Sequence, residues 1–163
     1  MGMLPLAGML FSCASGAGRQ QATTTVEDFE CHERYAEYSV QGGIMSVGEG
    51  NEPEAGVIVT CVGDRGPRLE KWRLLDDGHS RKDSAHSMPA EDFEAFWDRI
   101  ESTGWHNLSA CENPEATDGD PVYQLLIRND QAELSATCRG ITLPFPFDRI
   151  RNELDLAAAG YDH

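Results

Sequence analysis

The sequence predicts an α+β fold in which a small antiparallel β-sheet is packed by two helices. Three observations predict it. Short segments with strand alternation recur along the chain, two segments have the 3.6-residue periodicity of amphipathic helices, and turn residues separate these segments. The chain has 163 residues, which leaves about 130 once a leader and a linker are set aside, enough for one domain with a hydrophobic core.

Two strands are predicted at the start of the folded part. Residues 33–40 alternate between apolar and polar side chains until Gly42 and Gly43 end the strand. Residues 57–62 are a β-branched run, which is typical of a central strand. The glycine-rich segment between these strands is predicted to be a wide connection.

A third strand is predicted at residues 68–75, where the alternation places Trp72 on the face opposite to Lys71. Asp77-Gly78 is a turn signal directly after it. Residues 78–87 are polar and show no alternation of apolar side chains, so we predict a mobile loop there.

Two helices are predicted, at about 89–103 and 147–158. The first has an acidic outer face, and Gly104 follows it as a C-terminal glycine. Its apolar stripe is formed by Phe93, Phe96, Trp97 and Ile100. The stripe of the second consists of Phe147, Ile150, Leu154 and Ala158. Both stripes are expected to pack on the sheet. Between the helices, residues 122–128 and 131–138 are predicted to form a hairpin around Asn129-Asp130.

Charge and motifs exclude several functions. The net charge of −15 argues against nucleic acid, whose phosphates would be repelled, and is compatible with a basic protein partner. The chain has no P-loop, no H-E-x-x-H and no G-x-S-x-G, and its five histidines are scattered, so we expect no catalysis and no cofactor. The acidic loop is the strongest metal candidate, but its spacing does not match an EF-hand, and we expect no metal site. This loop contains Glu112, Glu115, Asp118 and Asp120.

The four cysteines after residue 30 predict two disulfides, because their number is even and none form a C-x-x-C pair. A metal site or free thiols are the alternatives. If 33–40 and 57–62 pair around the 41–56 connection, Cys31 lies opposite Cys61, which leaves Cys111 for Cys138. The second pair requires loop 112–120 to fold back.

Leu10-Phe11-Ser12-Cys13 follows a short apolar run and resembles a bacterial lipobox. The resemblance implies that residues 1–12 are a lipoprotein-type signal segment. No Lys or Arg precedes its apolar run, and a start codon assigned too far downstream would explain this. The resemblance also implies that Cys13 carries lipid such as palmitate, and that the chain is held at a bacterial cell envelope. The location would be the outer membrane, the periplasmic face or the cell surface. Residues 13–30 are small and polar and are predicted to be a flexible tether to the single domain 31–163.

The order of elements from 34 to 158 resembles emfourin-type inhibitors of thermolysin-like metalloproteases. The similarity is carried by a strand that ends in Gly42-Gly43-Ile44, two more strands, a helix that opens at residues 89–93, a hairpin and a closing helix. The resemblance implies protease inhibition as one form of protein binding, and it transfers no inhibitory residue.

These observations predict a lipid-anchored envelope protein that acts as a non-catalytic protein-binding module. Its contact loop is predicted at Gly42, Gly43, Ile44 and Met45, because loops on a rigid sheet often carry recognition. A wide turn without a binding role is the alternative for this segment. For the whole protein, the alternatives are an immunity-type protein that neutralises a basic toxin and a purely structural envelope lipoprotein.

Overall fold

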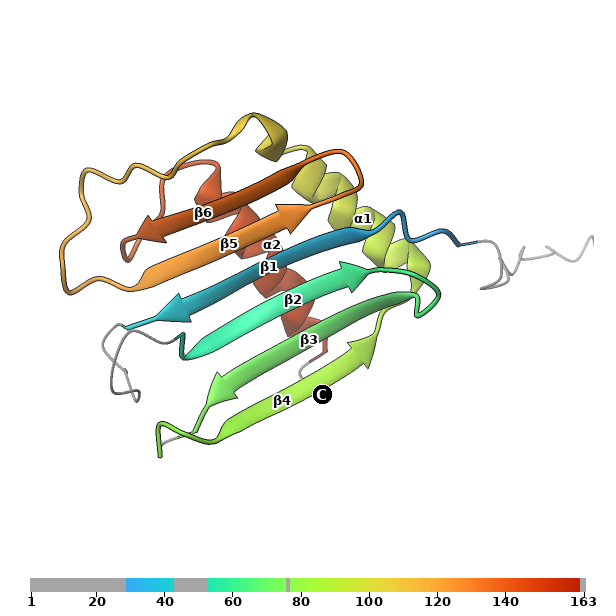
Figure 1. Ribbon diagram of the computed structural model, residues 1–163, viewed down its shortest axis with the longest axis horizontal. Coiled ribbons are helices and arrows are strands. Elements are labelled where there is room, and N and C mark those ends of the chain that lie inside the picture. The colour runs from blue at the N-terminus through green and yellow to red at the C-terminus, as the bar shows by residue number, and fades with distance from the viewer. Residues whose placement is uncertain (1–28, 43–52, 76, 162–163) are drawn as a thin grey trace, which may run out of the picture.

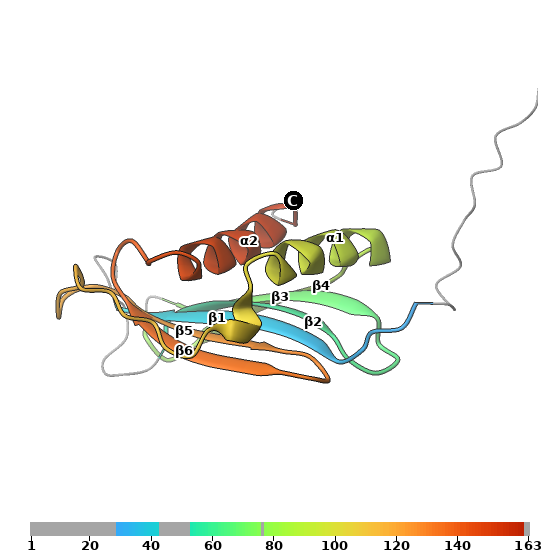
Figure 2. The same cartoon turned by 90° about the horizontal axis from the view of Figure 1, so that it is seen from above.

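The computed structural model describes residues 29–42, 53–75 and 77–161. These residues form a six-stranded antiparallel sheet with two helices on one of its faces (Figures 1 and 2). The strand order is β4-β3-β2-β1-β5-β6. The strands are β1 (Arg34–Gln41), β2 (Ala55–Cys61), β3 (Pro67–Leu74), β4 (Arg81–Ser87), β5 (Val122–Arg128) and β6 (Glu133–Arg139). The predicted α+β class is therefore confirmed.

The helices are α1 (Ala90–Glu101) and α2 (Phe147–Ala159), and a short 3-10 helix, η2 (Trp105–Asn107), follows α1. The predicted apolar stripes of α1 and α2 are buried against the sheet. Gly104 adopts φ 71° between α1 and η2, a left-handed conformation that glycine accommodates at a helix end. Both helices were predicted within two residues of their observed bounds.

Residues 81–87 form strand β4, so the prediction of a mobile loop at 78–87 is wrong. β4 pairs with β3 along its whole length, from Arg68 with Ser87 to Leu74 with Arg81. The Asp77 side chain organises the turn before it, because it accepts hydrogen bonds from the main-chain N–H groups of His79 and Ser80 and from the Ser80 hydroxyl. These bonds, that of the hydroxyl above all, lower the pKa of Asp77 to about 2. A strand at the edge of a sheet is held mainly by its main chain, so its side chains carry little hydrophobic pattern.

The helix-covered face of the sheet holds the core. Ala36, Val59 and Leu69 lie there in neighbouring strands and are fully buried. Trp72 alternates with Leu69 and Lys71 in β3, so its side chain lies on the opposite, open face. Lys71 reaches past the core and donates to the main-chain oxygen of Ala158 at the C-terminal end of α2, 3.3 Å away.

Both predicted disulfides are present, Cys31–Cys61 and Cys111–Cys138. The predicted register differs by three residues, because Arg34 and not Cys31 is opposite Cys61. The chain turns back at His32 and Glu33, both with positive φ, and this turn brings Cys31 to Cys61 from outside the strand.

Candidate functional site

Most of the predicted binding residues lie outside the described part of the chain. This holds for the lipidation residue Cys13 and for Gly43, Ile44 and Met45. Gly42 is described: it follows the last residue of β1 with φ 76°, and no atom lies within 4 Å of the position that a Cβ would take. It therefore marks the end of the sheet from which the predicted contact loop begins.

The strands run between two ends of the sheet, which we call the entry end and the distal end. At the entry end, where the chain enters β1, Tyr35 pairs with Arg128, which pairs with Glu133. At the distal end, Gln41 pairs with Val122, which pairs with Arg139. The eight residues of β1 separate these ends by about 27 Å, at about 3.4 Å per residue. Figures 1 and 2 show the start of β1 at one end of the molecule and the ends of β1, β3 and β6 at the other.

Two large apolar side chains are exposed in the connection from β6 to α2, at the distal end. Ile141 is 70% exposed and Phe145 is 73% exposed. The residues between and after them, Leu143 and Phe147, are buried and anchor the connection to the core. We call Ile141 and Phe145 the distal patch. The sequence patterns did not predict the distal patch, although Phe145 between Pro144 and Pro146 is an apolar residue in a segment that cannot pair as a central strand.

The connection that carries the distal patch is held by the acidic loop. Asn113 Nδ2 donates to the main-chain oxygens of Arg139 and Thr142, each at 2.9 Å. Gly140 permits this approach, because its φ is 142° and a Cβ there would lie 2.3 Å from Asn113 Nδ2. The Cys111–Cys138 disulfide fixes the start of the acidic loop to β6. The distal patch is thus held by one covalent bond and a pair of hydrogen bonds.

The acidic loop brings carboxylates to this end of the molecule. Glu112, Glu115 and Asp118 are exposed on the acidic loop, and the main-chain oxygen of Asp118 accepts a hydrogen bond from Arg139 at 2.8 Å. Asp120 accepts a hydrogen bond from the main-chain N–H of Thr117. An apolar patch beside solvated carboxylates is suited to a protein surface that combines an apolar centre with basic residues at its rim.

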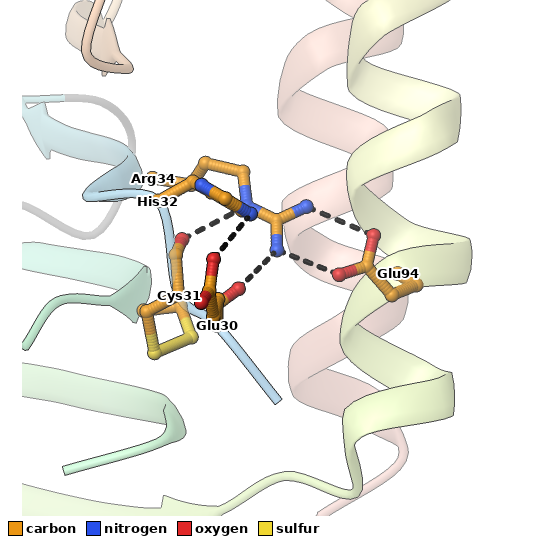
Figure 3. The surroundings of a disulfide bond; sticks show 6 residues. Glu30, Cys31, His32, Arg34 and Glu94 are labelled. Atoms are coloured by element: carbon orange, nitrogen blue, oxygen red, sulfur yellow. Dashed lines mark hydrogen bonds and ion pairs between the residues drawn. A yellow bond between two sulfur atoms is a disulfide. The ribbon is translucent and has the colours of Figure 1, made fainter. Parts of the chain in front are cut away.

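The entry end is built around Arg34, whose side chain is only 10% exposed (Figure 3). Its guanidinium donates to both carboxylate oxygens of Glu94 in α1, at 2.9 and 2.6 Å, and its Nε donates to the main-chain oxygen of Cys31 at 3.0 Å. The same group lies 4.7 Å from the ring centroid of Phe93 and 5.8 Å from that of Trp97. The hydrogen bond from Arg34, and with it the guanidinium charge, lowers the pKa of Glu94.

This cluster fastens the start of the domain to two different elements. Arg34 ties β1 to α1, and the neighbouring Cys31–Cys61 disulfide ties the preceding segment to β2. A pull on the N-terminal segment is therefore transmitted to a central strand and a helix, and not to the end of β1 alone.

The open face of the sheet is a second surface, and its aromatic residues are already covered. The Arg81 guanidinium lies 4.4 Å from the Trp72 ring centroid, and that of Arg128 lies 4.9 Å from the Tyr35 centroid. Trp72 packs directly on the main chain at Gly56, where a Cβ would lie 2.6 Å from its Nε1. Burial and a hydrogen bond to Glu37 raise the pKa of Tyr35, so its hydroxyl stays protonated. The aromatic side chains of this face are therefore covered by neighbouring groups, whereas the side chains of the distal patch are exposed.

Possible metal ligands are dispersed over the described part of the chain. Within residues 29–42, 53–75 and 77–161, no three His, Cys, Asp or Glu side chains form a group that could hold a metal ion. His32, His79, His86 and His106 lie in different elements or turns. In the same ranges, no helix combines the length and apolar character that a bilayer crossing demands.

Comparison with known proteins found no match: no family model, no curated protein and no solved structure is significantly similar to this chain.

Proposed function

We propose that this protein is a lipid-anchored module of the bacterial cell envelope that binds another protein through the distal end of its sheet and catalyses no reaction. The observation that carries the proposal is the placement of the distal patch. An anchor at Cys13 would hold the domain by its entry end, and β1 leads from there to the opposite end, where Ile141 and Phe145 are exposed.

The construction of both ends supports this proposal. The entry end is locked by Arg34 and the Cys31–Cys61 disulfide, as a point of attachment under load requires. The distal patch is held in one position by Asn113 and the Cys111–Cys138 disulfide, and a preorganised surface loses little conformational entropy on binding. The acidic loop beside it favours a partner with basic residues. Protease inhibition and neutralisation of a basic toxin are two forms that such binding would take.

Replacement of Cys13 tests the anchor. We expect Cys13→Ser to move the protein from the membrane fraction to the soluble envelope fraction and to abolish incorporation of labelled palmitate, because the acyl chains supply the only membrane affinity we propose. Ser12→Ala is the matched control and should stay membrane-bound. Equal membrane association of the Cys13→Ser protein would contradict the anchor without affecting the binding proposal.

A photoreactive residue at position 145 tests the binding surface. We expect irradiation of intact cells to join position 145 to one partner protein, which mass spectrometry then identifies. Leu156, on the outer face of α2 and 64% exposed, is the control position and should give no specific adduct. The same adducts at both positions, or none at 145, would contradict the proposed surface; a purely structural lipoprotein predicts the second result. Phe145→Ala should also reduce capture of the identified partner at least about tenfold, as expected for an aromatic anchor.

A further inference from the structure

The outer edge of β4 has free main-chain groups. The main-chain bonds Met88 N–H to Pro67 O and Leu75 N–H to Ser80 O show which residue pairs exchange hydrogen bonds in the β3–β4 ladder. Such pairs alternate along an antiparallel ladder, so the main-chain N–H and C=O groups of Lys82, Ser84 and His86 form hydrogen bonds with β3. The intervening residues direct their N–H and C=O groups outward. These residues are Arg81, Asp83, Ala85 and Ser87.

The two edges of the sheet differ in how they are protected. On β6, the outward oxygen of Arg139 accepts the side chain of Asn113, and the Cys111–Cys138 disulfide holds the acidic loop beside that edge. On β4, no main-chain hydrogen bond among the described residues uses the outward groups. β4 is therefore an edge at which another extended chain can pair along the whole strand, whereas on β6 the acidic loop occupies the Arg139 end.

A hollow of about 480 Å³ lies along β3 and β4 next to this edge, and Tyr161, which follows the end of α2, lines it. Its basic lining residues are Lys71, Arg73, Lys82 and His86. Lys71 and Lys82 are the only lysines of the whole sequence. The Tyr161 ring lies 5.5 Å from the His86 ring and bounds the hollow. We call this hollow the basic groove.

Two of the positive charges in the basic groove, Arg73 and Lys82, are not paired with a carboxylate of the described residues. Arg73 and Lys82 are direct cross-strand partners, and like charges in this position destabilise a sheet. Both side chains are exposed. Asp83 is the acidic residue in the lining of the groove, and its side chain is on the opposite face of β4, where it pairs with Arg81. In a chain of net charge −15, this local excess of positive charge is suited to an acidic ligand.

We propose that an extended acidic segment of a partner protein adds to β4 as a seventh strand. Its main chain pairs with the outward groups of Arg81, Asp83, Ala85 and Ser87. Every second side chain then lies on the helix side of the sheet, beside Lys82, Ser84 or His86, where a glutamate or aspartate meets the basic groove. This site is separate from the distal patch, so each can fail without the other.

The probe for this site is a blocked nine-residue peptide in which glutamate alternates with threonine. Titrated into the full chain, it should bind saturably and slow the hydrogen exchange of the outward amides of residues 81, 83, 85 and 87. The same peptide with lysine in place of glutamate should not bind. An absence of saturable binding by the glutamate peptide, or equal binding by both peptides, would overturn the proposal.

Two protein variants distinguish the contribution of main-chain pairing to peptide binding from that of electrostatic attraction. Ala85→Pro removes one outward N–H and leaves the β3–β4 bonds intact, because Pro is tolerated on the outer side of an edge strand; it should abolish binding. Lys82→Glu should weaken binding at least about tenfold, and Arg65→Glu, an equal charge change in the exposed β2–β3 turn, should alter it less than about twofold. Unchanged binding to Ala85→Pro or to Lys82→Glu would overturn the proposal.

A peptide modified on its own main chain tests strand pairing independently of whether the Ala85→Pro protein folds. Methylation of alternate peptide nitrogens removes the donors of strand pairing and keeps every charge. This peptide should not bind the unaltered protein. If it binds as tightly as the unmethylated peptide, the contact is electrostatic alone and strand addition is refuted.

Discussion

Replacing Cys31 and Cys61 together by alanine is expected to lower the free energy of unfolding by about 3–4 kcal/mol, and the same change at Cys111 and Cys138 by a similar amount. The partners are 30 and 27 residues apart, so the two bonds constrain the unfolded chain almost equally. Removal of both bonds should cost about 6–8 kcal/mol, which is comparable to the whole stability of many domains.

Urea unfolding of the three variants in a Cys13→Ser background measures these values without a free thiol. Reduction of the parent protein should reproduce the variant that lacks both disulfides. If the reduced parent unfolds at the same urea concentration as the oxidised one, the disulfides do not stabilise the domain.

The two disulfides should differ in their local effects. Loss of Cys111–Cys138 releases the acidic loop from β6 and should speed amide exchange around Asn113 and Thr142, and it should weaken contact through Phe145. Loss of Cys31–Cys61 should leave the distal end unchanged and loosen the entry end. Identical exchange patterns in the two variants would show that the ends are not independent.

Arg34→Ala is expected to lower the free energy of unfolding by about 3 kcal/mol, at the low end of the range for a broken buried ion pair. The change removes the bonds to Glu94 and Cys31 and the packing against Phe93. The remaining Glu94 side chain is 45% exposed and can turn to water, which limits the loss. Arg34→Met keeps the packing of the stem and should cost less than Arg34→Ala.

The effect of Arg34→Ala should depend on pH. The pKa of Glu94 is lowered in the folded protein from its ordinary value of 4.5, mainly by the hydrogen bond from Arg34. The ion pair therefore stabilises the folded state above about pH 4.5, and this contribution is lost as the pH falls through the lowered pKa. Urea unfolding of both proteins at pH 7 and pH 3 measures the difference. Glu94→Gln should remove most of the pH dependence; an equal effect of Arg34→Ala at both pH values would contradict the ion-pair account.

Much of the fold could be predicted from local patterns. The apolar stripes of α1 and α2 and the β5–β6 hairpin are confirmed, because each depends on residues that are close in sequence. The pairing of the cysteines is also confirmed, although the β1–β2 register from which it was inferred is wrong by three residues. β4 was missed because an edge strand with solvated side chains has no hydrophobic alternation. The three-residue error in the β1–β2 register came from the turn at His32 and Glu33, whose positive φ values no common turn signal announces.

The candidate site was only partly accessible to sequence reasoning. Gly42 ends β1 as predicted, while the other predicted contact residues lie outside the described part of the chain. Phe145 and Ile141 were missed, because exposure of an apolar residue depends on whether another element covers it. The basic groove was missed for a related reason: Lys71 and Lys82 are eleven residues apart in the sequence and come together only through β3–β4 pairing.

The sequence by itself therefore determined the fold class, the helical faces and the presence of two disulfides, since periodicity and an even number of cysteines are properties of the chain. Tertiary structure alone decided which face of the sheet the helices cover, which strand has a free edge, and that the entry end and the distal patch lie at opposite ends. The physical reason is that burial and the use of main-chain hydrogen-bonding groups depend on neighbours from distant parts of the chain, which no local pattern specifies.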